Sequence, residues 1–123
     1  MEKIENLLRD QIDESTLSFI REYIFSLDEL EILRFFGLNP GVRVDIENLL
    51  DVTFINREDM RKTLKMLVDT HILEETELEG KKYYELSRDT RVLELLNRLY
   101  CYYKNDTIRR LIIDYVMQKN MAA

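Results

Sequence analysis

Five apolar residues between positions 60 and 73 set the register of one helix and of the turn that follows it. Met60, Leu64 and Leu67 recur at three- and four-residue spacing, which places them on one helix face at about 100° per residue. Ile72 and Leu73 continue this face as the chain turns. The segment 56–70 is therefore predicted to be a helix that packs on a core through one face.

A β-hairpin is predicted directly after this helix. The sequences ILEETEL and KKYYELS flank Glu79 and Gly80, and a Gly-containing turn between two strand-like runs is typical of a hairpin. We expect its arms at 73–78 and 83–86, with the tip near Gly80.

Capping residues divide the chain before this helix into shorter elements. Ser26, with Glu29 three residues later, forms a capping-box pattern that predicts a helix from about Leu27 to the helix-breaking sequence GLNPG. The sequence VRV at 42–44 is long enough for only a small strand. Asp45 then caps a short helix in DIENLLD. Asn56 is the predicted cap of the longer helix at 56–70.

The two ends of the chain are also helical by pattern. Residues 2–12 and 16–25 each place apolar side chains near one face, as two short helices or one bent helix. Two further helices are expected within 88–120, with a break at Asn105 and Asp106. We expect that the chain cannot cover these apolar stripes alone, which favours a homodimer through 88–120, assisted by 1–25, over intrachain packing. The stripes comprise Val92, Leu95, Leu96, Leu99, Tyr100, Tyr103, Ile108, Leu111, Ile112, Tyr115 and Val116.

Composition agrees with one helix-rich folded domain. The chain has 123 residues, 46% hydrophobic and 34% charged, with three Gly and one Pro. No signal-peptide pattern or apolar run of membrane-spanning length is recognised, so a cytoplasmic protein without membrane association is expected. Cys101 is the only cysteine and is expected to be a buried structural thiol.

The order of these elements resembles a known fold. Helix, small strand, short helix, turn, longer helix and hairpin over residues 27–87 resemble the winged helix-turn-helix transcription regulators of bacteria and archaea, broadly those of the MarR and ArsR families. The resemblance implies an α+β, mostly helical winged helix-turn-helix domain at 27–87. Segments 1–26 and 88–123 would be additional helices, the latter a dimerisation region. The helix at about 56–70 would enter the DNA major groove, with a hairpin wing at about 73–86.

One residue departs from the pattern of these regulators. Their recognition helix commonly ends in Gly just before the final apolar pair, whereas this chain has His71. His is among the residues enriched at positive φ, although Gly adopts such a conformation at lower cost. We therefore expect His71 in a left-handed conformation at or just beyond the end of the helix.

Cations on the exposed flank of the 56–70 helix suggest a nucleic-acid interface. With Met60 at zero, Arg57, Arg61, Lys65 and Lys62 lie at about 60°, 100°, 140° and 200°. Such a flank can follow phosphates, and Arg can bond guanine edges in a major groove. The predicted partner is duplex DNA, and the predicted contacts are Asn56, Arg57, Arg61, Lys62 and Lys65 on the helix, Lys81 and Lys82 on the hairpin, and Arg43 before the short helix.

Two other interpretations stay open at this point. Glu58 and Lys62 form a favourable i, i+4 pair, so the flank is also consistent with an ordinary solvated helix face. Winged helices also serve as protein-docking modules in larger complexes, and a net charge of -6 suits that role. The same charge argues against a protein that coats polyanions generally.

Catalysis has little support in this sequence. His71 is the only histidine, and no phosphate-binding Gly-rich loop occurs, so we expect no enzyme activity, no metal site and no cofactor. Tyr100, Tyr102 and Tyr103 either line a small effector pocket or serve as core or dimer contacts. Whether a small-molecule effector exists is left open.

Overall fold

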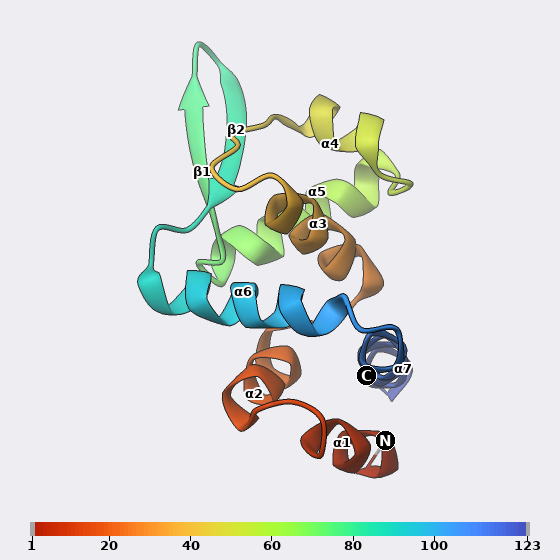
Figure 1. Cartoon of the computed structure of the whole chain (residues 1–123). Coiled ribbons are helices and arrows are strands. Elements are labelled where there is room, and N and C mark those ends of the chain that lie inside the picture. The colour runs from red at the N-terminus through yellow and green to blue at the C-terminus, as the bar shows by residue number, and fades with distance from the viewer. Residues whose placement is uncertain (1, 123) are drawn as a thin grey trace. The chain divides into compact units, whose positions relative to one another are not determined.

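The computed structural model describes residues 2–122, and within this range the chain is mostly helical with one two-stranded antiparallel sheet (Figure 1). The α+β expectation is confirmed at this level. The elements are α1 (Glu2–Arg9), α2 (Glu14–Tyr23), α3 (Leu27–Leu38), α4 (Ile46–Val52), α5 (Arg57–Asp69), β1 (Leu73–Leu78), β2 (Lys81–Leu86), α6 (Thr90–Tyr103) and α7 (Asp106–Ala122).

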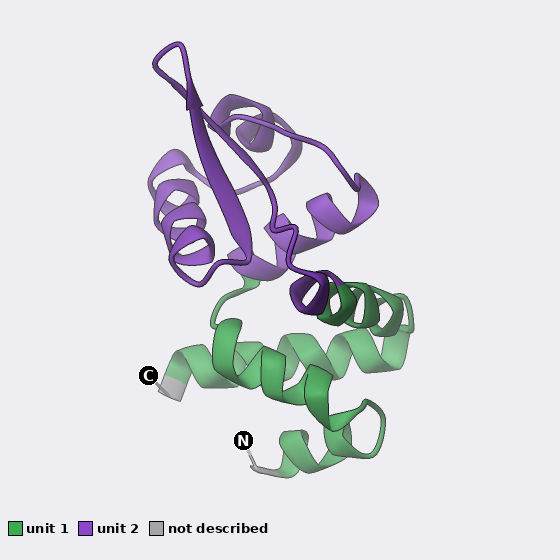
Figure 2. Cartoon of the chain, turned by 90° about the vertical axis from the view of Figure 1, so that its left-hand side faces the viewer, with its two compact units in different colours: residues 1–27, 94–123 green, residues 28–93 purple. Residues whose placement is uncertain are grey.

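The chain divides into two compact units, shown in different colours in Figure 2. Residues 1–27 and 94–123 form the first unit, and residues 28–93 form the second. The two terminal segments, expected from sequence as separate extensions, therefore share one unit. The second boundary between the units falls inside α6, six residues later than the expected start of the C-terminal segment at residue 88.

The second unit is built around the face of α5 that the apolar spacing predicts. Met60, Leu64 and Leu67 are all at most 1% exposed, and Ile72 and Leu73 beyond the turn are equally buried. The other buried apolar residues of this unit are Leu30, Ile32, Leu33, Phe36, Val44, Leu49 and Ile55. The predicted register of α5 is confirmed.

Helix boundaries follow the predicted caps closely. Asp45 and Asn48 form a reciprocal capping box at the start of α4. The Asn56 side chain accepts a hydrogen bond from the Asp59 backbone N–H at the start of α5. α3 begins at Leu27, as predicted from the Ser26 signal. These caps occupy N–H groups that would otherwise lack intrahelical acceptors.

The hairpin has the predicted location, with a second arm longer than expected. β1 and β2 pair in antiparallel register from Leu73 with Leu86 to Leu78 with Lys81, so the second arm begins at residue 81 rather than 83. Glu79 and Gly80 both have positive φ, 53° and 78°, which is the geometry of a tight two-residue hairpin turn. The small strand expected at 42–44 is reduced to one antiparallel bridge between Val44 and Tyr84.

His71 adopts the predicted left-handed conformation, with φ of 63°. Its backbone N–H donates to the Val68 carbonyl, and the Ile72 N–H donates to the Leu67 carbonyl, both at 3.0 Å. These two bonds form a Schellman motif, in which the last carbonyls of α5 find donors and the buried Ile72 packs near the end of the helix.

Replacing His71 by Gly is expected to leave the free energy of unfolding unchanged or raise it by about 0.5–1 kcal/mol. The side chain is exposed, and Gly adopts a left-handed conformation without the steric cost that a Cβ atom introduces. Urea denaturation of both proteins measures the difference. A clear loss of stability would show that the imidazole makes a contact that the fold needs.

The first unit contains most of the apolar stripes that led us to expect a dimer, while Val92 lies in the second. Every residue named for those stripes in 88–120 is buried or half-buried in the single chain, and Leu99, Ile112, Tyr115 and Val116 are at most 5% exposed. On the apolar faces of the N-terminal segments, however, Leu7 and Tyr23 are 45% and 38% exposed, so one chain covers its terminal apolar stripes only in part. The homodimer itself stays a prediction.

The Lys119 side chain caps the C-terminal end of α2 in this unit. Its ammonium group donates to the carbonyl oxygens of Ile20, Arg21 and Ile24 at 2.7–2.8 Å. It also lies 4.6 Å from the ring centre of Phe25 and 5.3 Å from that of Tyr115. One cation from α7 thus binds the helix end where the carbonyl dipoles favour positive charge.

Cys101 corrects an expectation from the sequence, because its side chain is exposed rather than buried. Leu99 defines the buried face of α6, and two residues along a helix correspond to a rotation of about 200°. The thiol therefore lies on the opposite face. None of the helices in residues 2–122 combines the length and apolar character needed to cross a membrane.

Candidate nucleic-acid interface

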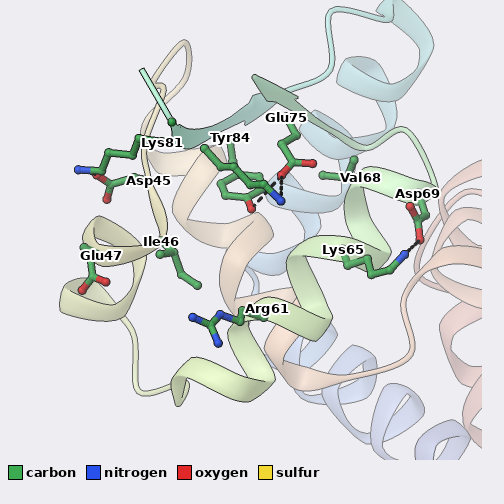
Figure 3. A pocket seen from close by; sticks show the side chains of 12 residues that line it. Asp45, Ile46, Glu47, Arg61, Lys65, Val68, Asp69, Glu75, Lys81 and Tyr84 are labelled. Atoms are coloured by element: carbon green, nitrogen blue, oxygen red, sulfur yellow. Dashed lines mark hydrogen bonds and ion pairs between the residues drawn. The ribbon is translucent and has the colours of Figure 1, made fainter. Parts of the chain in front are cut away.

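A groove of about 700 Å³ lies within the second unit, between α5, the start of α4 and the hairpin (Figure 3). Ile46, Val68 and Tyr84 supply its apolar lining. Four of the predicted DNA contacts also line it, namely Arg61, Lys65, Lys81 and Lys82. The fold thus brings cations from α5 and from the hairpin, about 20 residues apart in sequence, to one groove.

The groove is balanced in charge, because four acids line it beside the four cations. These acids are Asp45, Glu47, Asp69 and Glu75. A groove with equal numbers of both charges attracts a polyanion less strongly than the cations alone would suggest.

All but one of the seven predicted cationic contacts are already paired with acids. The pairs are Arg43–Glu85 at 3.4 Å, Arg57–Glu47 at 2.7 Å, Lys62–Glu58 at 3.4 Å, Lys65–Asp69 at 3.1 Å, Lys81–Asp45 at 2.7 Å and Lys82–Glu75 at 3.3 Å. Arg61 forms no ion pair with any residue that the structure describes. In Figure 3 its side chain extends from α5 toward α4. Arg61 is therefore the cation most available to an incoming anion.

Asp45 connects the start of α4 to the hairpin. The hydrogen bond from the Lys81 ammonium, together with the backbone N–H of Asn48, holds the pKa of the buried Asp45 carboxyl below its usual value. The same contact raises the pKa of Lys81. Because the pKa of Asp45 is lowered on folding, this pair stabilises the fold at neutral pH. That contribution is lost only as the pH falls below about 4 through the lowered pKa.

Glu47 and Arg57 form a second link, between α4 and the first turn of α5. The hydrogen bond from the Arg57 guanidinium lowers the pKa of Glu47, and the same bond raises that of Arg57. Both side chains are about half exposed, so solvent screens the pair and it contributes little to stability. A phosphate group can therefore compete with Glu47 for Arg57.

The Asn56 side chain caps α5, so its amide group is already hydrogen-bonded within the chain and is not free to contact DNA. Its side-chain oxygen accepts from the Asp59 N–H at 2.9 Å, and its amide nitrogen donates to the Asp59 carboxylate at 3.0 Å. Asn56, Arg57, Lys62 and Arg43 do not line the groove. The eight predicted contacts are therefore divided between the groove and the surface around it.

Sequence reasoning named the cations but missed the acids that pair with most of them. Asp69 follows Lys65 by four residues in one helix, so helical spacing alone was sufficient to predict that pair. Glu47 and Arg57 are ten residues apart on different helices, and Asp45 and Lys81 are 36 apart. No local pattern indicates those two contacts.

Exposed apolar side chains lie at the end of α4 and in the turn before α5. Val52 is 56% exposed and Phe54 is fully exposed. Apolar side chains displayed on a turn are a feature of protein contacts, so this turn is the observation that favours the docking interpretation.

The three tyrosines near the end of α6 have different surroundings. Tyr102 lines a shallow hollow of about 440 Å³ and exchanges hydrogen bonds with Asp13 at 3.0 and 3.2 Å. The Tyr100 ring lies under the Lys104 ammonium, and the Tyr103 ring lies near the Arg109 guanidinium. No group of three or more His, Cys, Asp or Glu residues in the described part of the chain is arranged to hold a metal ion.

Comparisons of this chain with protein-family models, with curated proteins and with solved structures find no match.

Proposed function

We propose that residues 28–93 form a winged helix-turn-helix module that binds duplex DNA. In this proposal α5 is the recognition helix in the major groove and the β1–β2 hairpin is the wing. The observation that carries the proposal is that cations of α5 and cations of the hairpin line the same groove. The bridge between Val44 and Tyr84, which joins the residue before α4 to the hairpin, also suits this fold.

The groove is the place for one phosphodiester strand. If α5 lies in a major groove and the wing reaches across the adjacent backbone, the strand between them runs along the groove. Arg61 would then bind a phosphate directly, since it has no acid to displace among the described residues. Lys65, Lys81 and Lys82 would bind phosphates only by exchanging them for Asp69, Asp45 and Glu75.

These exchanges predict weak non-specific affinity. Each displaced acid stays beside the bound phosphate and repels it, and the chain carries a net charge of -6. Tight binding would therefore depend on contacts to base edges, which is the behaviour required of a sequence-specific regulator.

Titration of labelled random-sequence duplex with the full chain tests this proposal. At low salt we expect binding whose affinity falls by about 0.9 log units per log unit of salt for each phosphate contacted, of which the four groove cations contribute up to about 3.6 per chain. Selection from a random library should then enrich one motif. Absence of binding at low salt would contradict the proposal.

The second candidate function is protein docking, which the exposed turn at Val52 and Phe54 favours. Under that function the turn carries the affinity and the groove is an ordinary solvated surface. Substituting Phe54 by Ser would then abolish complex formation with the partner and leave DNA retention unaffected.

We keep the homodimer as a separate proposal, because two recognition helices about 34 Å apart would match successive major grooves. Light scattering over a concentration series tests it, and a monomer at high micromolar concentration would exclude it.

A further inference from the structure

The outermost ridge of α5 is made of charges of both signs. With the buried Met60 at zero, Glu58 lies at about 160° and Lys62 at about 200°, on the side opposite the core. Arg57, at about 60°, pairs with Glu47 of α4, and Arg61, at about 100°, lines the groove. The side chains that project farthest from the first half of α5 are therefore Glu58 and Lys62.

Glu58 and Lys62 are the most accessible pair on this surface. Their side chains are 80% and 71% exposed, and the Lys62 ammonium lies 3.4 Å from the Glu58 carboxylate. Neither residue lines the groove. The neighbouring polar groups have other roles, because Asn56 caps the helix and Arg57 is bonded to Glu47.

We propose that Glu58 and Lys62 together read one C·G base pair in the major groove. This inference rests on the proposed DNA-binding function, in which the N-terminal half of α5 lies nearest the bases. The Glu58 carboxylate accepts a hydrogen bond from the cytosine N4 amino group, and the Lys62 ammonium donates to O6 and N7 of the paired guanine. The ion pair between Glu58 and Lys62 stays intact and contacts the major-groove edges of both bases.

The order of groups across the major groove makes this contact selective. A C·G pair presents a donor on cytosine and then two acceptors on guanine, which matches a carboxylate followed by an ammonium. An A·T pair in the same orientation also offers the carboxylate a donor, adenine N6, but places the adenine N7 acceptor beside it. Where guanine N7 would accept from Lys62, this pair has the thymine methyl group. The reversed G·C and T·A pairs place an acceptor opposite the carboxylate, which repels it.

Glu58 also disfavours incorrect positions on DNA. A carboxylate that projects from the recognition helix is repelled by phosphates wherever it lacks an amino group to accept from. This gives an acid on the DNA-facing ridge a role that a solvated helix face does not require.

Library selection with the wild type and Glu58→Gln tests the inference. We expect the wild type to enrich a motif with a C·G pair, and Glu58→Gln to shift that one position to A·T by about tenfold, because Gln bonds adenine N6 and N7. Glu22→Gln is the matched control, because Glu22 is exposed on α2 in the other unit and does not line the groove, so the same charge is removed away from the proposed contact. It should leave the motif unchanged at every position.

Each alternative result has a defined meaning. A wild-type motif that Glu58→Gln leaves unchanged at every position overturns this inference but leaves the proposed DNA binding intact, and so does duplex binding without any enriched motif. A wild type that does not bind duplex at low salt overturns the proposed function and this inference with it. Circular dichroism melting confirms that both variants fold, as expected for exposed positions.

Discussion

Replacing Arg61 by Glu is expected to lower the affinity for every duplex by about 100-fold or more at low salt. The change removes the one groove cation that has no ion pair among residues 2–122. It also leaves three cations against five acids in the groove, so a phosphate strand meets repulsion where it met a free guanidinium. Fluorescence anisotropy with a labelled duplex at fixed ionic strength measures the loss.

Arg34→Glu is the matched control for this prediction. Arg34 is exposed on α3 in the same unit and does not line the groove, so the substitution changes the net charge equally without touching the proposed contact. We expect only a small loss of affinity from it. Equal losses in the two variants would show that net charge alone, and no contact in the groove, determines binding.

Replacing Lys119 by Met is expected to lower the free energy of unfolding by about 2–4 kcal/mol. The substitution keeps an aliphatic side chain but removes a cation that donates to three carbonyl oxygens at the end of α2. The Ile20 carbonyl keeps the Ile24 N–H as a donor. The Arg21 and Ile24 carbonyls lose the ammonium in a partly buried place, which is costly, and the favourable interaction of the cation with the helix end is lost as well. Urea denaturation measures the change.

Lys104→Met provides the comparison for this stability effect. Lys104 is exposed, and its ammonium lies 4.8 Å from the centre of the Tyr100 ring without an ion pair to any residue of 2–122, so its replacement should cost at most about 1 kcal/mol. A loss from Lys119→Met no larger than that from Lys104→Met would contradict the view that Lys119 closes the end of α2.

Local features of this fold could be predicted from the sequence because they depend on neighbouring residues. The register of α5 follows from Met60, Leu64 and Leu67, and the caps at Asp45 and Asn56 follow from residues within one turn. The left-handed His71 was expected from the resemblance to regulators whose recognition helix commonly ends in Gly just before the apolar pair. Each of these signals lies within a few residues of the structure it determines.

Features that depend on tertiary packing could not be predicted in this way. Lys119 binds carbonyls 95–99 residues earlier in the chain, and the Asp45–Lys81 pair requires the hairpin to lie beside α4. The exposure of Cys101 was predicted wrongly because the apolar residues beside it in sequence lie on other faces of α6. The acids that balance the groove come mostly from elements other than those of their partner cations.

Mapping of backbone amide chemical shifts during a duplex titration tests the central claim most directly. We predict that the largest changes, in slow or intermediate exchange with the selected motif, fall on the first half of α5 and on both strands of the hairpin. Val52 and Phe54 should change little. Changes confined to that turn, or no changes at low salt, would contradict the claim that duplex DNA binds along α5 and the hairpin.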